Sequence, residues 1–316
     1  MIASVEEHGS QRAESLALAR VALAAMSWGF VPLLVRAVHT SPLVIAFWRV
    51  ALGGLAFFVF FLVRGRLGEV GRLARRDIAW LGLLGALLAA GWVLFFSAIT
   101  RAPVAVAVLI TFTGPLFLAV LSPVFTGDPF DRRVALPLLV AFAGTLVIAF
   151  PWGEGVAGDG GPGSQVVGAT LALGSAVTLA VMTAAQKRVL RRLSPEVVMF
   201  SQTVIAALVL LPVAVVSSGP GSSGEWAAVA ILGFGLTTVP FLLFLSGLRR
   251  VRADRVGVVT YVEPLSAVLL AAVFLHEPLA PPTIVGGLAV VTGGFLVARL
   301  SPLMVPEAPA VEMSER

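Results

Sequence analysis

The chain has 316 residues, of which 58% are hydrophobic and only 12% are charged, and its mean hydropathy is +0.99. An average soluble domain carries about twice that share of charged residues, so this composition excludes an ordinary water-soluble fold and indicates a polytopic membrane protein. The chain has no cysteine, and its histidines, His8, His39 and His276, lie far apart. We therefore expect no disulfide, no metal cluster and no cofactor.

Apolar runs of about 20 residues, the length with which a helix crosses the hydrocarbon of a bilayer, recur along the whole chain. They predict an all-α polytopic membrane protein with ten transmembrane helices. In chain order we place the helices at 16–36, 42–63, 77–99, 102–125, 132–150, 165–188, 195–217, 225–248, 253–276 and 281–300.

The remaining segments divide the chain into two units. Residues 1–15 are acidic and lack a basic start, so we interpret them as a cytoplasmic tail rather than a signal peptide. A glycine-rich external linker at 151–164 separates a first unit of five helices (16–150) from a second (165–300). Residues 301–316 are rich in proline and glutamate and are interpreted as a second cytoplasmic tail.

The basic residues alternate sharply between the predicted loops. One set of loops holds fifteen, whereas the opposite loops hold Arg36 and Arg101. By the positive-inside rule the fifteen face the cytoplasm, and so do both termini, in a cell inner (plasma) membrane. The net charge of +5 and the pI of about 11.1 fit this topology better than a nucleic-acid partner. The fifteen are Arg64, Arg66, Arg72, Arg75, Arg76, Arg132, Arg133, Lys187, Arg188, Arg191, Arg192, Arg249, Arg250, Arg252 and Arg255.

The two units repeat one another at an offset of 149 residues. The stretch TFTGPLFLAVLSPVFTGDPF (111–130) aligns without a gap with TYVEPLSAVLLAAVFLHEPL (260–279), so that Pro115 falls on Pro264. Because each unit has an odd number of spans, the second must enter the bilayer from the opposite face. The sequence therefore predicts two inverted five-helix repeats, an architecture in which secondary transporters alternate access about a site at the repeat interface.

These features resemble the drug/metabolite transporter superfamily in its ten-helix EamA branch, over about residues 16–300. The resemblance implies a transporter that moves amino acids, other small metabolites or toxic organic compounds, often outward. It departs from the family pattern at Asp128, where the family usually has Glu. The residues that carry it are Trp28-Gly29, Ser41-Pro42, Arg49, Pro115, Pro264, Asp128-Pro129, Glu277-Pro278, Gly144, Gly286, Gly287, Gly293 and Gly294.

Glu263 is an acidic residue within an apolar run, where a charge costs about 2.5–3.5 kcal/mol on insertion scales. Helical spacing places Thr260 and Glu263 on one face of their helix. We interpret Glu263 as a site for a proton or a substrate ammonium group, since intramembrane carboxylates are usually functional. The alternative is that it is neutralised by an internal partner and only fixes helix packing.

Arg49 is the obvious electrostatic partner for Glu263, because it lies seven residues into its helix, about 10 Å from the end. Its counterpart in the second repeat is Gln202, which is polar but neutral. Arg49 is therefore a candidate for binding a substrate carboxylate or for tuning Glu263. A purely structural role remains the alternative.

Three prolines predict interrupted helices. Pro32, Pro115 and Pro264 lack an N–H, so the carbonyls of the residues four positions earlier, Trp28, Thr111 and Thr260, are left without their helical partners. Free carbonyls at membrane depth are tolerated where they line a cavity, so we expect a central polar cavity with gating turns at these prolines.

Aromatic residues within the spans are candidates for the walls of this cavity, with ordinary helix packing as the alternative. They are Trp28, Trp92, Phe112 and Tyr261. Glu277 precedes the last span on the outer side and is interpreted as a helix-entry or packing residue.

The sequence thus favours a secondary transporter that exports a small amphipathic metabolite such as an amino acid, driven by protons or by the substrate's own gradient. An importer and an uncoupled facilitator stay open, and so does a homo-oligomer. No P-loop is present, and a membrane-embedded enzyme is disfavoured because titratable residues do not cluster. A non-transporting scaffold is disfavoured by the inverted repeat. The expected partners are a small-molecule substrate, the lipid bilayer and protons.

Overall fold

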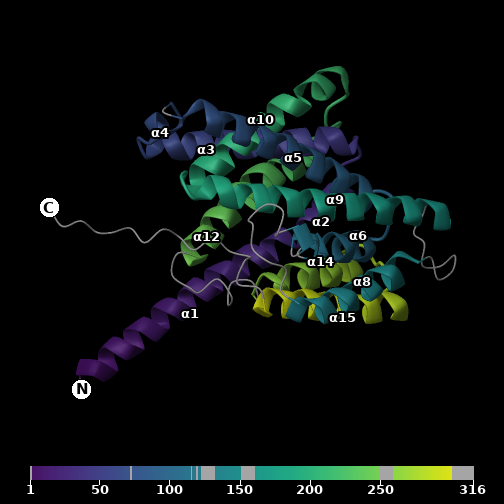
Figure 1. The fold of residues 1–316 in the computed structure, drawn as a ribbon. Coiled ribbons are helices and arrows are strands. Elements are labelled where there is room, and N and C mark those ends of the chain that lie inside the picture. Colours follow the sequence, from purple (N-terminus) through teal and green to yellow (C-terminus); the bar gives the residue numbers. More distant parts are fainter. Residues whose placement is uncertain are drawn as a thin grey trace.

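The computed structural model describes residues 2–71, 73–114, 116–118, 120–121, 132–150, 161–248 and 259–300. Over these residues the fold is all helical (Figure 1). Six helices are long and apolar enough to cross a membrane, and four shorter apolar helices accompany them. The six are Ser15–Arg36, Pro42–Val63, Arg75–Ile99, Gly163–Leu190, Pro195–Val216 and Ser223–Gly247, and the shorter four are Val104–Leu118, Ala135–Ala149, Val262–Phe274 and Pro281–Leu296.

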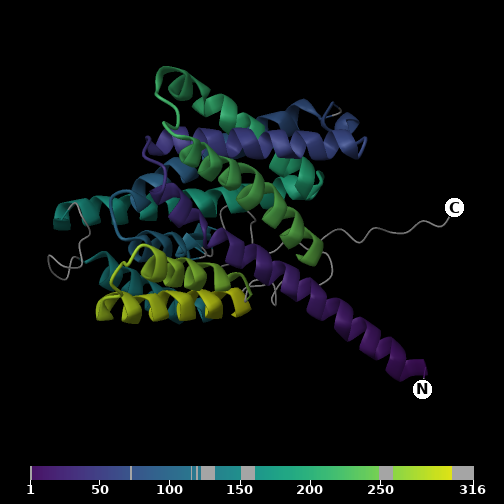
Figure 2. The ribbon, with the colours of Figure 1, turned by 180° about the vertical axis from the view of Figure 1, so that it is seen from behind.

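The helices form two groups joined by central elements (Figures 1 and 2). The first group contains α3 (Pro42–Val63), α5 (Arg75–Ile99), α10 (Pro195–Val216), α11 (Ser223–Ala230) and the π-helical segment η3 (Ile231–Thr238), with the short α4 (Leu67–Gly71) beside it. The second contains α6 (Val104–Thr111), the 3-10 turn η1 (Arg132–Val134), α8 (Ala135–Ala149), α14 (Val262–Phe274) and α15 (Pro281–Leu300). The central elements are α1 (Ile2–Trp28), α2 (Val31–Arg36), α9 (Gly161–Leu190) and α12 (Val239–Leu248).

Several helices that correspond in the sequence repeat also pack against each other. These pairs are α3 with α10 and α8 with α15, and α6 also packs against α14, which belongs to the span that corresponds to its own. The first pair shares its start: Ser41 and Ser194 cap the two helices by accepting a hydrogen bond from the main-chain N–H three residues later, at 3.4 Å in both cases. The same Ser-Pro pair thus begins both helices for the same physical reason, with Pro at the position where its missing N–H costs nothing.

The last pair, α8 and α15, is held by glycines. A Cβ atom added at Gly144 would lie 2.6 Å from the Gly286 carbonyl oxygen, and one added at Gly293 would lie 2.6 Å from that of Pro137. The two backbones therefore touch, which is how helices associate in a membrane without a hydrophobic driving force.

Three of the predicted spans are interrupted, each within a few residues of one of the three prolines named above. The chain turns at Gly29–Phe30 between α1 and α2, at Phe112–Thr113 after α6, and at Tyr261 before α14. Pro32 lies in the first turn of α2 and Pro264 in that of α14. Pro115 lies outside the described residues.

A fourth predicted span, 225–248, is continuous but not regular. It passes from α11 through the π-helical turn η3 into α12. Pro240 explains the change, because it cannot donate to the carbonyl of Leu236 four residues earlier.

Parts of the predicted first tail and of the predicted linker are helical. The segment 1–15, predicted as a tail, is helical from residue 2 and continues into the first span as α1 (Figure 2). α9 begins at Gly161, inside the predicted linker. The remainder of that linker (151–160), the segment 301–316 and the Asp128-Pro129 pair lie outside the described residues.

Candidate functional site

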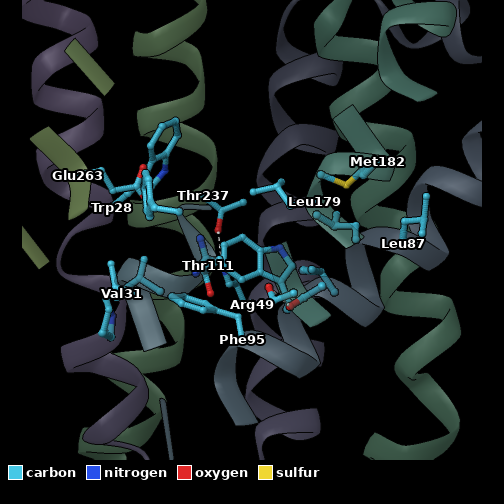
Figure 3. A pocket seen from close by; sticks show the side chains of 18 of the residues that line it. Trp28, Val31, Arg49, Leu87, Phe95, Thr111, Leu179, Met182, Thr237 and Glu263 are labelled. Carbon is cyan, nitrogen blue, oxygen red and sulfur yellow. Dashed lines mark hydrogen bonds between the residues drawn. The ribbon is translucent and has the colours of Figure 1, made fainter. Parts of the chain in front are cut away.

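A cavity of about 370 Å³ lies in the middle of the bundle, between the two helix groups (Figure 3). That volume lies within the range of small-molecule sites in proteins, about 300–1,000 Å³. Most of the lining is apolar or aromatic. The lining residues are Trp28, Val31, Pro32, Arg49, Val50, Leu87, Leu88, Gly91, Trp92, Phe95, Val108, Thr111, Phe112, Ser175, Leu179, Met182, Met199, Thr203, Thr237, Glu263 and Ala267.

Arg49 lines the cavity from α3 and is 2% exposed. Its guanidinium carbon lies 3.8 Å above the centre of the Trp92 ring and 5.8 Å from that of Phe96, two aromatics one turn apart on α5. Stacking of this kind stabilises a desolvated cation through the ring quadrupole by about 2 kcal/mol.

The segment η3 supplies the hydrogen-bond acceptors of Arg49. Its Nε donates to Thr237 Oγ1 at 3.1 Å (Figure 3). Its Nη2 donates to the Leu236 carbonyl oxygen at 3.4 Å. Pro240, four residues later, cannot donate an α-helical hydrogen bond to that carbonyl. Thr237 Oγ1 in turn donates to the Leu232 carbonyl at 2.8 Å, so the hydroxyl is engaged as donor and as acceptor.

Small residues bring α3 close enough to η3 for these bonds to form. A Cβ atom at Gly233 would lie 3.1 Å from the Arg49 carbonyl oxygen and 3.3 Å from the Gly53 nitrogen. Thr238 Oγ1 also donates to the Gly53 carbonyl at 3.3 Å. The backbones therefore meet at the level of Arg49, which places the guanidinium within hydrogen-bonding distance of η3.

Glu263 lies on the facing wall, in the first turn of α14 beside Trp28 (Figure 3). Within the described part of the chain, no ion pair of 4 Å or less joins it to Arg49, and its carboxylate has no hydrogen-bond partner there. The expected partnership is therefore not a direct contact. Arg49 is held by aromatic rings, the Thr237 hydroxyl and the Leu236 carbonyl, whereas Glu263 lines the cavity.

The cavity brings together several other residues singled out in the sequence, namely Trp28, Pro32, Trp92, Thr111 and Phe112. Thr111 Oγ1 lies 3.5 Å from the Ala172 carbonyl oxygen, to which it donates, and so connects α6 to α9. Phe112 contacts the Tyr261 ring with centroids 6.5 Å apart.

Other candidates lie behind the wall rather than in it. Tyr261 is buried against Gly294, and its hydroxyl has no partner among the described residues. Gln202 is 1% exposed and accepts a hydrogen bond from Gln186 Nε2 at 2.9 Å. Thr260 and Pro264 also do not line the cavity, although the helical spacing placed Thr260 beside Glu263. The turn at Tyr261 interrupts that spacing.

Several lining residues were missed by the sequence reasoning. Met182, Met199 and Phe95 look like ordinary membrane-helix residues and carry no signal. Ser175 donates to the Gly91 carbonyl at 3.1 Å across α9 and α5. Thr237 had a signal, because Pro240 three residues later removes a main-chain donor from its helix, as Pro264 does.

Outside the cavity, Glu277 joins three segments at one end of the bundle. Its Oε2 accepts the Val104 N–H at 2.7 Å, and its Oε1 lies 3.3 Å from Arg36 Nη2. The same Nη2 also donates to the Ala102 carbonyl at 2.8 Å. Because α6 begins after Pro103 with no side-chain cap of its own, Glu277 caps that helix from the segment before α15.

No metal site is evident at these positions. Among the described residues, no group of three or more histidines and carboxylates could hold a metal ion.

Comparison with known proteins places the chain among transporters. The model of the EamA-like transporter family matches it twice, over residues 15–150 and 166–299. An uncharacterised transporter of Archaeoglobus fulgidus is 27% identical over 280 residues, which cover 89% of this chain and 95% of that protein. The threonine/homoserine exporter RhtA of Escherichia coli is 29% identical over 239 residues, 74% of each protein. The aromatic amino acid exporter YddG of Ancylobacter novellus is 30% identical over 204 residues, 63% of this chain and 70% of that protein.

One solved crystal structure has the same fold, with a TM-score of 0.63 and 24% identity. The similarity covers 90% of this chain and 96% of that one.

Proposed function

Because the chain belongs to the EamA-like transporter family, we propose that it is a secondary active transporter that exports a small amphipathic metabolite, such as an amino acid, by alternating access. Membership makes the chain a multi-pass membrane transporter and not an enzyme. The proposal concerns its substrate class, direction and mechanism.

The observation that carries the proposal is the central cavity with a basic and an acidic side chain on facing walls. Arg49 lies on the wall made by α3 and Glu263 on the wall made by α14, with aromatic and aliphatic side chains between them. A substrate with a carboxylate, an ammonium group and an apolar body matches that distribution. The names of two relatives, exporters of threonine and homoserine and of aromatic amino acids, point in the same direction.

Alternating access is supported by the duplication. The two matches to the family model divide the chain into units 15–150 and 166–299. Helices from three pairs of corresponding spans pack against each other across the interface of the units. Such packing is expected of ten spans arranged as inverted repeats, whose interchange of conformations opens the cavity to each side in turn. We assign both termini and the fifteen clustered cations to the cytoplasmic face of the cell membrane.

Glu263 is the proposed coupling site. Among the described residues that line the cavity it is the acidic one, and it carries no internal ion pair. Glu263 would bind a proton in one half of the transport cycle and release it in the other half. A substrate ammonium group would occupy the same site in place of the proton.

The test uses proteoliposomes preloaded with a pool of amino acids and small organic cations. Release of each compound is followed by mass spectrometry with and without an imposed pH gradient, for the wild type, Glu263→Gln and the control Glu69→Gln. Glu69 is a matched carboxylate because it lies on α4, outside the cavity. We expect gradient-dependent release of at least one amino acid by the wild type and the control, and loss of that dependence in Glu263→Gln.

Two results would contradict the proposal in different ways. Gradient-dependent release by Glu263→Gln at the wild-type rate would remove Glu263 from the coupling mechanism. Uptake into empty vesicles with no release from loaded ones, under either gradient, would favour the importer.

A further inference from the structure

We propose that Arg49 is the carboxylate-binding group of the cavity, and that the transporter therefore selects monocarboxylates with a large apolar side chain. This inference rests on the proposed transport function and deepens it. It adds a defined subsite, the group that binds there, and the residues that hold the guanidinium in position.

The hydrogen bonds of Arg49 leave one edge of the guanidinium free. A guanidinium has five N–H groups arranged in a rigid planar fork. The Nε hydrogen and one Nη2 hydrogen, which share an edge, are taken by Thr237 and the Leu236 carbonyl. Nη1 is buried and has no hydrogen-bond partner among the described residues. The remaining edge, formed by Nη1 and the second Nη2 hydrogen, has the geometry that binds a carboxylate through two parallel hydrogen bonds.

The Trp92 ring that stacks on Arg49 limits the direction from which a ligand can approach the guanidinium. Trp92 lies 3.8 Å from the guanidinium carbon and covers one face of the group. A ligand anion therefore meets the guanidinium in its plane, at the free edge. Trp92 and Thr237 act as positioning residues, because they orient Arg49.

The charges around the cavity favour a single negative charge on the ligand. Among the described lining residues Arg49 is the cation, and the other polar side chains are Thr111, Ser175, Thr203, Thr237 and Glu263. A phosphate or a dicarboxylate ligand would bring a second negative charge into the cavity. Among the described lining residues no second cation would pair with that charge, and the Glu263 carboxylate would repel it. A monocarboxylate satisfies Nη1 and brings no excess charge.

The apolar walls accommodate the rest of such a ligand. Phe95 and Phe112 line the cavity together with Leu179 and Met182, and Trp28 lies beside Glu263. Aromatic and thioether side chains adapt well to large apolar groups. The class that fits is therefore a carboxylate attached to an aromatic or long aliphatic side chain, with or without an amino group.

The experiment measures binding to purified full-length protein in lipid nanodiscs by isothermal titration calorimetry. The probes are L-phenylalanine, 3-phenylpropanoate, L-phenylalaninamide and phenethylamine, which separate the carboxylate from the ammonium group. The variants are Arg49→Gln, Thr237→Val and the control Arg64→Gln. Arg64 is the matched control because it also lies over a ring, that of Phe60 at 5.7 Å, but is exposed and outside the cavity.

We expect the wild type and Arg64→Gln to bind the two carboxylate probes about 10- to 100-fold more tightly than the amide and the amine, as a charged hydrogen-bond pair predicts. Arg49→Gln should abolish this preference by weakening the carboxylate probes by a similar factor while leaving the amide almost unchanged. If Arg49→Gln does not fold, Thr237→Val supplies the test, since it removes the acceptor of Nε, together with the hydroxyl's bond to the Leu232 carbonyl, and should reduce the preference without affecting the amide.

Three results would overturn the inference. One is a folded Arg49→Gln or Thr237→Val protein that keeps the wild-type preference. Another is chloride at equal concentration displacing 3-phenylpropanoate, which would indicate a general anion site. The third is binding of the amine as tight as that of L-phenylalanine. Release of organic cations but of no carboxylate from the loaded vesicles would refute this subsite and leave the transporter intact, whereas release of no compound at all would refute the proposed function itself.

Discussion

Replacing Glu277 with alanine should favour opening of the end of the bundle at which α2, α6 and the segment before α15 meet. In the present conformation that end is closely packed, with Phe96, Ile99 and Val104 fully buried. The Glu277 carboxylate joins segments of the two sequence repeats there, through Arg36 and the Val104 N–H. A movement that separates the repeats at this end must break both contacts.

The magnitude follows from the two contacts. The bond from the Val104 N–H at 2.7 Å has a charged acceptor, and losing such a bond costs about 1.5–3 kcal/mol. The ion pair with Arg36 is longer, 3.3 Å, and its side chains are 29% and 15% exposed, so it adds about 0–1 kcal/mol. Loss of about 2 kcal/mol shifts a two-state equilibrium roughly 30-fold. Glu277→Gln keeps an acceptor for the N–H and should give an intermediate shift.

Cysteine labelling measures this shift directly, because the chain has no cysteine of its own. Val31 lines the cavity and is 3% exposed, so Val31→Cys reports access from the end capped by Glu277. A membrane-impermeant maleimide added from that side should label the reporter about 30-fold faster in the Glu277→Ala background. Glu69→Gln, which breaks an exposed ion pair elsewhere, is the control. Labelling at the same rate in a folded Glu277→Ala protein would refute the argument that this contact holds the end closed.

Three further changes test local features of the fold. Arg66 donates hydrogen bonds of 2.6 and 3.0 Å to Glu69, and these bonds lower the pKa of the Glu69 carboxyl below its usual value. The stability that this contact contributes should therefore be fully present above the pKa of the unfolded chain and be lost as the pH falls through the lower pKa of the folded protein. An NMR titration of the carboxyl group measures this pKa. Gly144→Leu should lower the free energy of unfolding by at least about 1–3 kcal/mol, measured by unfolding in detergent, because the backbone of α15 occupies the space. Gly82→Leu, at a position with nothing within 4 Å, should have little effect. Ser41→Ala removes the cap of α3 and should cost about 1 kcal/mol in the same measurement.

The helical composition of the fold could be predicted from the sequence, because apolar length alone decides which segments cross a bilayer. Much of the cavity could be predicted as well. Arg49 and Glu263 can be identified because a charged side chain within an apolar membrane span is costly and usually functional. Pro32 can be identified because it lacks the N–H that a helix uses for a hydrogen bond. The partner of Arg49 could not be predicted in the same way. The nearest opposite charge in the predicted spans was Glu263, yet the structure gives Arg49 an indole ring, a threonine and a carbonyl instead.

The reason is that a proline specifies a vacant carbonyl but not the group that will bind to it. Pro240 leaves the Leu236 carbonyl without a helical donor, and this is legible in a single sequence. Which donor replaces it depends on a helix 187 residues away, which reaches η3 only because Gly53 and Gly233 allow the two backbones to touch. With Nε and Nη2 held by η3, Nη1 of Arg49 has no hydrogen-bond partner among the described residues, so the unpaired edge of the guanidinium is a consequence of tertiary packing. Restoring the donor with Pro240→Ala would return the Leu236 carbonyl to its helix, and the selectivity for carboxylates should weaken although no lining side chain has been changed.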